Sequence, residues 1–199
     1  MMIESNPNLN KNVLLAVTMS SNFLNPLMGA AVNVALPRIG EEFLMSAVGL
    51  SWVSMSFLLT SSVFLVPFGK ISDSWGRMKM FLYSNILFAL SSIFCALSFS
   101  SEILIIGRLF QGIASAGIFA TSMAIVISAF DQHERGKMIG LNVMAVYIGL
   151  SLAPVLGGVL TSSWGWRSLF YINAGAVLLI IFAIITKIKA EWAVPSNAK

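Results

Sequence analysis

Six stretches of mainly apolar residues divide this sequence, and they restrict its fold more than any other feature. A helix of about 20 apolar residues crosses the hydrocarbon core of a bilayer, where the backbone has to satisfy its own hydrogen bonds. Each stretch is therefore predicted to be a transmembrane helix, and the expected fold is an all-α, integral membrane bundle. The predicted spans are residues 13–36, 50–68, 81–99, 103–129, 138–160 and 169–186. They form one transmembrane domain over residues 13–187, flanked by the polar ends 1–12 and 188–199.

Charge and reactive side chains exclude several other classes of protein. Charged residues make up only 10% of the chain, whereas soluble domains carry about 25%. The net charge of +4 does not indicate nucleic-acid binding, because the basic residues are scattered over short loops and form no stripe. Cys95 is the only cysteine and His133 the only histidine, so the sequence predicts neither a disulfide nor a metal site. It contains no nucleophile–base pattern, and we expect no enzyme activity.

Lysine and arginine are concentrated in every second loop, which predicts the orientation of the bundle. If the N-terminus lies in the cytoplasm, nine of the twelve basic residues fall on the cytoplasmic side. These nine are Lys11, Lys70, Arg77, Lys79, Arg135, Lys137, Lys187, Lys189 and Lys199. The opposite side holds only Arg38 and Arg167, while Arg108 lies inside a span. We therefore expect a multi-pass protein of the cell membrane with both termini in the cytoplasm.

Two loops resemble each other at an offset of 89 residues. Residues 69–77 read GKISDSWGR, and residues 158–167 read GVLTSSWGWR. The offset corresponds to three helices with their loops, so the two copies lie on opposite sides of the membrane. Secondary transporters are often built from such inverted three-helix repeats. The alternative is a chance similarity between two loops rich in glycine, serine and tryptophan.

The first of these loops carries a cluster of charges between two glycines, Gly69 and Gly76. Asp73 lies close to Arg77 and Lys79, at the junction of two predicted helices. A carboxylate there can cap a helix or pair with arginine, so the cluster could lock the inner face in one conformation. The alternative is a solvated loop whose charges only determine topology.

Arg108 is the one basic residue inside a predicted span. Burying its charge in lipid costs about 3 kcal/mol on insertion scales, so such a residue usually faces the bundle interior or an aqueous path. Gln111 and Ser115 follow on the same helical face. This face could form a polar wall of a transport path. The alternative is an arginine near the outer interface that extends to water.

A polar stripe runs along the first predicted span. Its members are Thr18, Asn22, Asn25, Gly29 and Asn33, and at 100° per residue they fall within an arc of about 80°. Asparagines are costly in lipid, so the stripe is expected to line a cavity or to face protein. Pro26 lies beside it and could kink the helix. The alternative is interhelical hydrogen bonding that holds the bundle together.

Small residues repeat every four positions in the fifth predicted span. Gly149, Ala153 and Gly157 form the repeat, with Pro154 and Gly158 beside them. Small residues at this spacing let two helix backbones approach closely. The segment could be a hinge that also seals the transport path against leakage, or simply a site of static close packing.

Five segments together resemble the major facilitator superfamily over nearly the whole chain. Residues 67–79, PFGKISDSWGRMK, resemble its loop motif between helices two and three. Residues 104–112, LIIGRLFQG, and 149–158, GLSLAPVLGG, resemble the motifs of helices four and five in its proton-coupled antiporters. Residues 33–37, NVALP, and 164–173, WGWRSLFYIN, resemble signatures of the fourteen-helix drug:proton antiporter branch.

This resemblance implies the N-terminal half of a rocking transporter that expels drugs or other hydrophobic or cationic compounds in exchange for protons. Asp73 and Arg77 would belong to the inner charge lock, Arg108 would assist proton coupling, and residues 149–158 would form the seal and hinge. The expected energy source is the proton gradient, with no cofactor. The expected partners are the lipid bilayer, a small-molecule substrate and a second half of six to eight helices.

The sequence departs from the family pattern at three points. An acidic residue that is frequent in helix one is replaced by Met28, and a glycine of the helix-five motif is replaced by Ala153. The chain also ends after six predicted helices, whereas the family has twelve or fourteen. Two alternatives therefore stay open: a different solute exporter of the same superfamily, and a non-transporting fragment or assembly partner.

Overall fold

The computed structural model describes residues 11–188 and contains six helices over that range. The helices are α1 (Lys11–Phe43), α2 (Ala47–Trp75), α3 (Arg77–Ala96), α4 (Ser101–Ala129), α5 (Gln132–Trp164) and α6 (Arg167–Lys187). Each is long and apolar enough to cross a membrane. The six predicted spans are therefore six helices. The predicted cytoplasmic end 1–12 lies outside the described residues except for its last two, and the tail 188–199 except for its first.

The helices extend beyond the apolar runs, so the connections are shorter than the sequence suggests. Gly76 alone separates α2 from α3, and α5 begins at Gln132. Residues 131–137, which lie between two predicted spans, are thus mostly helical. The Asp131 backbone carbonyl accepts hydrogen bonds from the backbone N–H groups of Glu134 and Arg135, which starts the helix. Polar side chains outside the hydrocarbon layer are compatible with helix because water solvates them.

The third helix instead ends at Ala96, before the predicted end at residue 99. The Ser98 hydroxyl donates to the Cys95 carbonyl over 2.7 Å, which satisfies an acceptor at the helix end. The side chain of Ser100 then accepts a hydrogen bond from the backbone N–H of Ile103 and caps α4. Phe99 is apolar but belongs to this turn, because capping groups on both sides determine where the helices stop.

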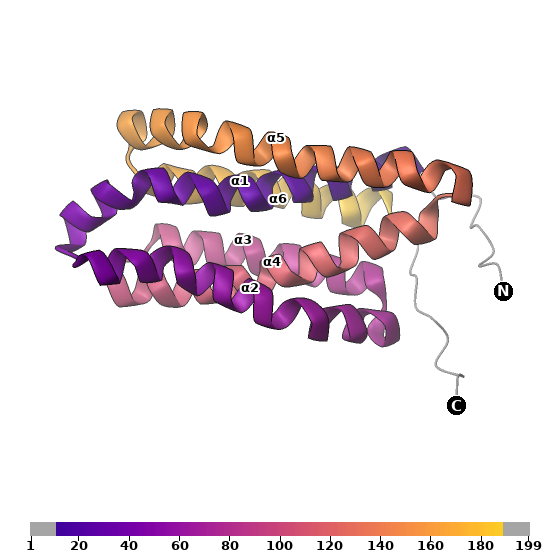
Figure 1. Cartoon of the computed structure of the whole chain (residues 1–199), viewed down its shortest axis with the longest axis horizontal. Helices are drawn as coiled ribbons and strands as arrows, with labels where there is room; N and C mark the ends of the chain where they lie inside the picture. The colour runs from indigo at the N-terminus through magenta and orange to yellow at the C-terminus, as the bar shows by residue number, and fades with distance from the viewer. Residues whose placement is uncertain (1–10, 189–199) are drawn as a thin grey trace.

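The six helices run back and forth along one long axis (Figure 1), so α1 begins and α6 ends at the same end of the bundle. α1 packs mainly against α5, and α2 packs mainly against α4. α3 lies against both α4 and α6. This pairing is what an inverted repeat requires, because exchanging α1–α3 with α4–α6 turns the α1–α5 contact into the α4–α2 contact.

The 89-residue offset also relates individual contacts. A Cβ atom on Gly112 of α4 would overlap Thr60 and the Phe57 carbonyl of α2. The equivalent crossing, offset by 89 residues, brings Gly149 of α5 against the Phe23 carbonyl of α1. The two turns agree as well, since Gly76 (φ 113°) and Gly165 (φ 79°) both adopt the left-handed backbone that favours glycine. The fold is therefore two inverted three-helix repeats.

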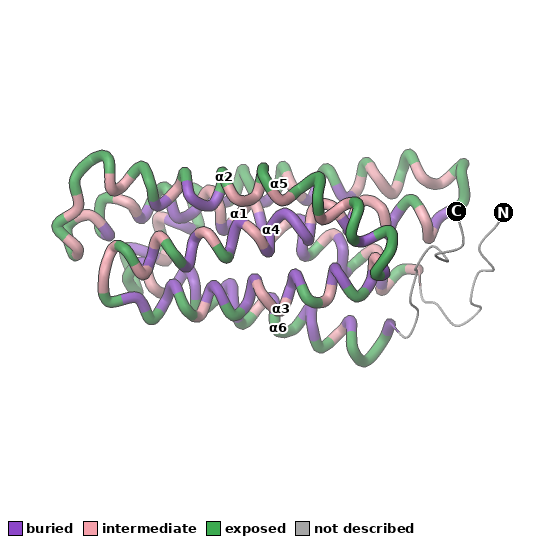
Figure 2. Tube along the Cα trace, turned by 90° about the horizontal axis from the view of Figure 1, so that it is seen from below, coloured by how far each residue is buried: buried purple, intermediate pink, exposed green. Residues whose placement is uncertain are grey.

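Buried residues follow the inner faces of the helices, and exposed residues cover the outer faces (Figure 2). α2 and α5 are the least enclosed. Only 17% and 22% of their most apolar segments are buried within the bundle, against 56% for α3 and α4. Their outer faces are apolar, as lipid or another helical bundle requires.

Candidate transport site

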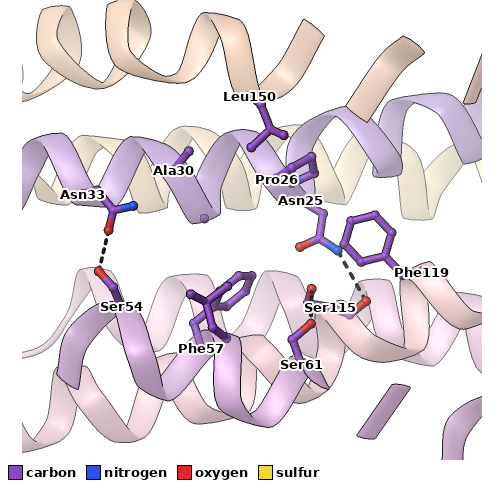
Figure 3. A pocket seen from close by; sticks show the side chains of 12 residues that line it. Asn25, Pro26, Ala30, Asn33, Ser54, Phe57, Ser61, Ser115, Phe119 and Leu150 are labelled. Atoms are coloured by element: carbon purple, nitrogen blue, oxygen red, sulfur yellow. Dashed lines mark hydrogen bonds between the residues drawn. The ribbon is translucent and has the colours of Figure 1, made fainter. Parts of the chain in front are cut away.

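A cavity of about 270 Å³ lies between α1, α2, α4 and α5 (Figure 3), and it is open on one side, where Leu58 and Leu150 are exposed. The residues that line it are Asn25, Pro26, Gly29, Ala30, Asn33, Ser54, Phe57, Leu58, Ser61, Ser115, Phe119 and Leu150. Its wall combines aromatic and aliphatic surface with a few amide and hydroxyl groups. This is the usual composition of a site for small organic molecules.

Three of the predicted pathway residues, Asn25, Asn33 and Ser115, lie in this wall. Asn25 is buried, and its amide nitrogen donates to the Ser115 backbone carbonyl over 3.4 Å. Asn33 lies at the exposed end of the cavity and accepts a 2.5 Å hydrogen bond from the Ser54 hydroxyl. The Ser115 hydroxyl lies 3.2 Å from that of Ser61. Hydrogen bonds between polar groups of the cavity thus connect α1, α2 and α4.

The α2 side of the cavity was missed in the sequence. Ser54, Phe57, Leu58 and Ser61 recur at three- and four-residue spacing, so they share one face of α2. That spacing was a usable signal. It was hidden because serine and phenylalanine are common in transmembrane helices, and neither stands out as an asparagine or an arginine does.

Arg108 is fully buried, behind the cavity wall. Its guanidinium carbon lies 4.3 Å from the centre of the Phe57 ring, and the ring separates it from the cavity. Its Nε donates to the Val53 carbonyl over 3.1 Å, and its Nη1 donates to Gln111 Oε1 over 2.5 Å. This enclosure excludes the alternative of an arginine that extends to water. Over residues 11–188, no carboxylate pairs with this charge.

Gln111 and Asn22 lie outside the cavity lining. Gln111 is buried and holds Arg108 on one side while donating to the Ser92 hydroxyl over 2.8 Å on the other. Asn22 donates to Asn142 of α5 and accepts from Ser122 of α4, both over 3.0 Å. Both side chains connect helices, and for Asn22 this is the alternative that the sequence left open.

The inner charge cluster is built around Arg77 at the start of α3. Its Nε and Nη2 donate to Asp73 Oδ1 over 3.0 and 2.7 Å. Its Nη1 donates to the Ala124 carbonyl over 3.2 Å and to the Ser128 hydroxyl, both on α4. Arg77 therefore ties the α2–α3 turn to the end of α4.

The other residues of the predicted lock have different surroundings. Gly76 forms the turn itself. A Cβ atom on Gly69 would meet nothing within 4 Å, so no packing requires glycine at that position. Lys79 is exposed on α3.

The small residues of α5 face α1. Gly149, Ala153 and Gly157 are buried, and a Cβ atom on Gly157 would lie 2.9 Å from the Ala31 carbonyl oxygen. Pro154 is exposed, and a Cβ atom on Gly158 would reach only Val34, at 4.0 Å. One face of the motif thus makes the close helix contact, while the proline lies on the outer side.

Comparison with known proteins identifies the family. The sequence matches the Major Facilitator Superfamily over residues 18–198, nearly the whole chain. The chain belongs to the major facilitator superfamily. It is 38% identical over 161 residues to the multidrug resistance protein Stp of Mycobacterium tuberculosis, covering 80% of this chain and 29% of Stp. It is 31% identical over 164 residues to the methylenomycin A resistance protein of Bacillus subtilis, covering 80% of this chain and 35% of that protein.

A third relative is named for a different substrate. The riboflavin transporter RibZ of Clostridioides difficile is 30% identical over 172 residues, which cover 86% of this chain and 38% of RibZ. The chain thus spans about a third of the length of these relatives. In the described part of this major facilitator chain, no group of three or more His, Cys, Asp or Glu side chains could hold a metal ion.

A second charge cluster of this major facilitator chain lies at the opposite end of the bundle and was not found in the sequence. Glu42 at the end of α1 accepts from Arg167 Nη1 over 2.9 Å and from Trp166 Nε1 over 2.7 Å. Arg167 Nη2 lies 2.7 Å from Glu42 Oε1 and also donates to the Ser98 carbonyl over 2.9 Å. The repeat gave no signal for this pair, because the 89-residue offset relates Glu42 to Asp131, which pairs with Lys11, and relates Arg167 to Met78.

Replacing Arg77 with glutamine should lower the melting temperature of the purified protein in detergent. Arg77→Gln removes charge-assisted hydrogen bonds to α4, which are worth about 2 kcal/mol together. For a chain of this length that corresponds to about 6 °C. Asp73→Asn should cost under about 1 kcal/mol, because its side chain is 55% exposed and such surface pairs contribute little. Equal losses in the two variants would show that the bonds to α4 do not matter.

Proposed function

We propose that this chain forms the N-terminal half of a secondary transporter that exports drugs or other hydrophobic compounds in exchange for protons. The observation that carries the proposal is the cavity, which is lined by helices from both inverted repeats and lies beside the buried Arg108. Inverted repeats with a site near the midplane are typical of alternating-access transporters. Two resistance proteins among the relatives support export of toxic compounds.

The proposed location is the cell membrane, with both termini in the cytoplasm. α1, α3 and α5 begin at one end of the bundle, and α2, α4 and α6 finish there (Figure 1). The described basic residues at that end are Lys11, Lys70, Arg77, Lys79, Arg135, Lys137 and Lys187. The opposite end holds Arg38 and Arg167. Positive residues are retained on the cytoplasmic side, so the richer end is assigned to the cytoplasm.

A second half would complete the transport path. α2 and α5 bury little of their surface within the bundle, and Asn33 is exposed at the end of the cavity. Lipid cannot satisfy that amide, whereas another helical bundle can. The length of the relatives supports a partner of comparable or greater size, whether it is part of the same polypeptide or a separate one.

Proton coupling is proposed to act through Arg108. Its charge is fully buried with no paired carboxylate in the described range, so its hydrogen bonds to Val53 and Gln111 hold it in place. A change in its surroundings during the transport cycle would alter the free-energy cost of keeping that charge buried. The proton gradient is the proposed energy source, and the inner cluster at Asp73 and Arg77 is proposed to hold one of the two conformations.

Everted membrane vesicles from cells that express the complete protein test this function. A hydrophobic fluorescent dye should accumulate when a pH gradient is imposed, and a protonophore should abolish the accumulation. Dye accumulation that ignores the gradient, or that equals the level in vesicles without the protein, would contradict the proposal.

A second candidate is export of a metabolite, which the likeness to the riboflavin transporter favours. Gradient-driven uptake of riboflavin into the same vesicles, without dye uptake, would select it.

A further inference from the structure

One buried acceptor in the cavity wall has no hydrogen-bond partner. Asn25 Oδ1 is enclosed, with the whole residue 0% exposed, and it is the only side-chain atom in this state among the residues that line the cavity. The amide nitrogen donates to the Ser115 carbonyl, which determines which end of the amide is the oxygen. Figure 3 shows that this oxygen is turned toward the space between α1 and α2. A buried acceptor without a donor is costly, so the site is suited to a ligand that supplies one.

The other side-chain oxygens of the cavity wall already take part in hydrogen bonds. The Ser54 hydroxyl donates to Asn33, and the Ser61 and Ser115 hydroxyls bond to each other. For a ligand that donates a hydrogen bond, Asn25 Oδ1 is therefore the buried acceptor in the wall that is still without a partner. Phe57 and Phe119 provide the apolar surface beside it.

The charges around the cavity favour uncharged ligands over cationic ligands. None of the residues that this chain contributes to the cavity wall is acidic. Arg108 lies on the far side of the Phe57 ring, 4.3 Å from the ring centre, and its Nη2 has no partner. This positive charge repels a cationic ligand through a medium of low dielectric constant, where charges are screened poorly. An uncharged hydroxyl or amide N–H meets no such repulsion.

We propose that the cavity selects uncharged aromatic compounds with a hydroxyl or N–H group donated to Asn25 Oδ1, and that it discriminates against lipophilic cations. The proposal rests on the proposed transport function for its context. It narrows the substrate class from hydrophobic or cationic compounds to uncharged hydrogen-bond donors. Asn25 becomes a specificity-determining residue, and Arg108 acts on selectivity through its charge.

Equilibrium binding of three matched probes to the purified complete protein in lipid nanodiscs tests the proposal. The probes share one fluorescent aromatic scaffold and carry a hydroxyl, its methyl ether, or a trimethylammonium group. The hydroxyl compound should bind about tenfold more tightly than the ether, and the cation, which like the ether has no hydrogen to donate, should bind at least about tenfold more weakly than the ether. Equal affinities for the hydroxyl and ether compounds, or no binding of any probe, would overturn the assignment.

Two variants test which residue determines the hydroxyl preference and which kind of charge determines the affinity for the cation. Asn25→Leu should abolish the preference for the hydroxyl over the ether, and a preserved preference would overturn the role of Asn25. Asn33→Asp places a carboxylate in the wall while still accepting the bond from Ser54, so its fold should be retained. This variant should bind the cation about tenfold more tightly than the wild type does, with the hydroxyl preference unchanged. A cation affinity that does not rise would overturn the electrostatic part.

Binding and transport separate the two proposals. If the hydroxyl probe binds as expected but no gradient drives its movement, the transport function fails and the assignment of the cavity holds. If gradient-driven export is observed for the cation and for the ether as readily as for the hydroxyl compound, the transport function holds and the assignment of the cavity is wrong.

Discussion

Gly112→Val is expected to prevent the chain from folding into a stable bundle. A Cβ atom at this position would overlap Thr60 and the Phe57 carbonyl oxygen, and that carbonyl belongs to the backbone of α2, so it cannot turn aside. The helices would have to separate, which loosens the α2–α4 contact and the cavity together. Overpacking of this kind costs about 3 kcal/mol or more. Gly149→Val should have a similar effect at the related crossing with Phe23.

Thermal unfolding of the purified protein in detergent, together with the yield of monodisperse protein, measures this effect. We expect a fall of about 10 °C or a loss of folded material. Gly136→Ala is the matched control, because a Cβ atom there would meet nothing within 4 Å and the position is helical. Alanine should stabilise the helix by up to about 1 kcal/mol. A Gly112→Val protein with the same melting temperature as the Gly136→Ala control would refute the close-contact argument.

Arg108→Lys is expected to reduce gradient-driven export about 100-fold while leaving the fold intact. Arginine donates in two directions at once, to Val53 and to Gln111, and its planar group lies over Phe57. Lysine keeps the charge but has no planar fork, so it cannot hold all three contacts. A displacement of about 1 Å in a positioned group can cost about 100-fold in rate. Initial rates of dye uptake into everted vesicles under a fixed pH gradient provide the measurement.

The matched control is Arg38→Lys, an equivalent change at a side chain that is 67% exposed and paired only with a neighbouring surface carboxylate. Its uptake rate should stay within about twofold of the wild type. Melting temperatures of both variants exclude unfolding as the cause. An Arg108→Lys rate close to that of the control would show that charge alone, without the geometry, is sufficient.

The polar stripe of α1 shows what helical periodicity can predict and what it cannot. It places Asn22, Asn25 and Asn33 on one side of the helix. Asn22 and Asn25 are buried in the protein, and Asn33 lies at the exposed end of the cavity. Their environments nevertheless differ. Asn22 bonds to two other helices, Asn25 lies in the cavity wall with a free acceptor, and Asn33 is exposed. Periodicity defines an angle around the axis, whereas the neighbour at each height depends on how the other helices cross.

The contacts of Arg108 and Glu42 likewise depend on how the helices approach one another. The sequence places Arg108 on one face with Gln111, but its enclosure by Val53 and Phe57 depends on the approach of α2. Glu42 lies more than 120 residues from Arg167 in the chain and pairs with it only because α1 and α6 meet at one end of the bundle.

The six spans, the all-helical fold and the inverted repeat could be read from the sequence, because a bilayer acts on each segment locally. Apolar length determines which segments enter the membrane, and backbone hydrogen bonding makes them helices. The cavity, the buried arginine and the free acceptor of Asn25 required the folded bundle. They arise where side chains from three or four helices meet, and the spacing along one helix carries no information about those distances.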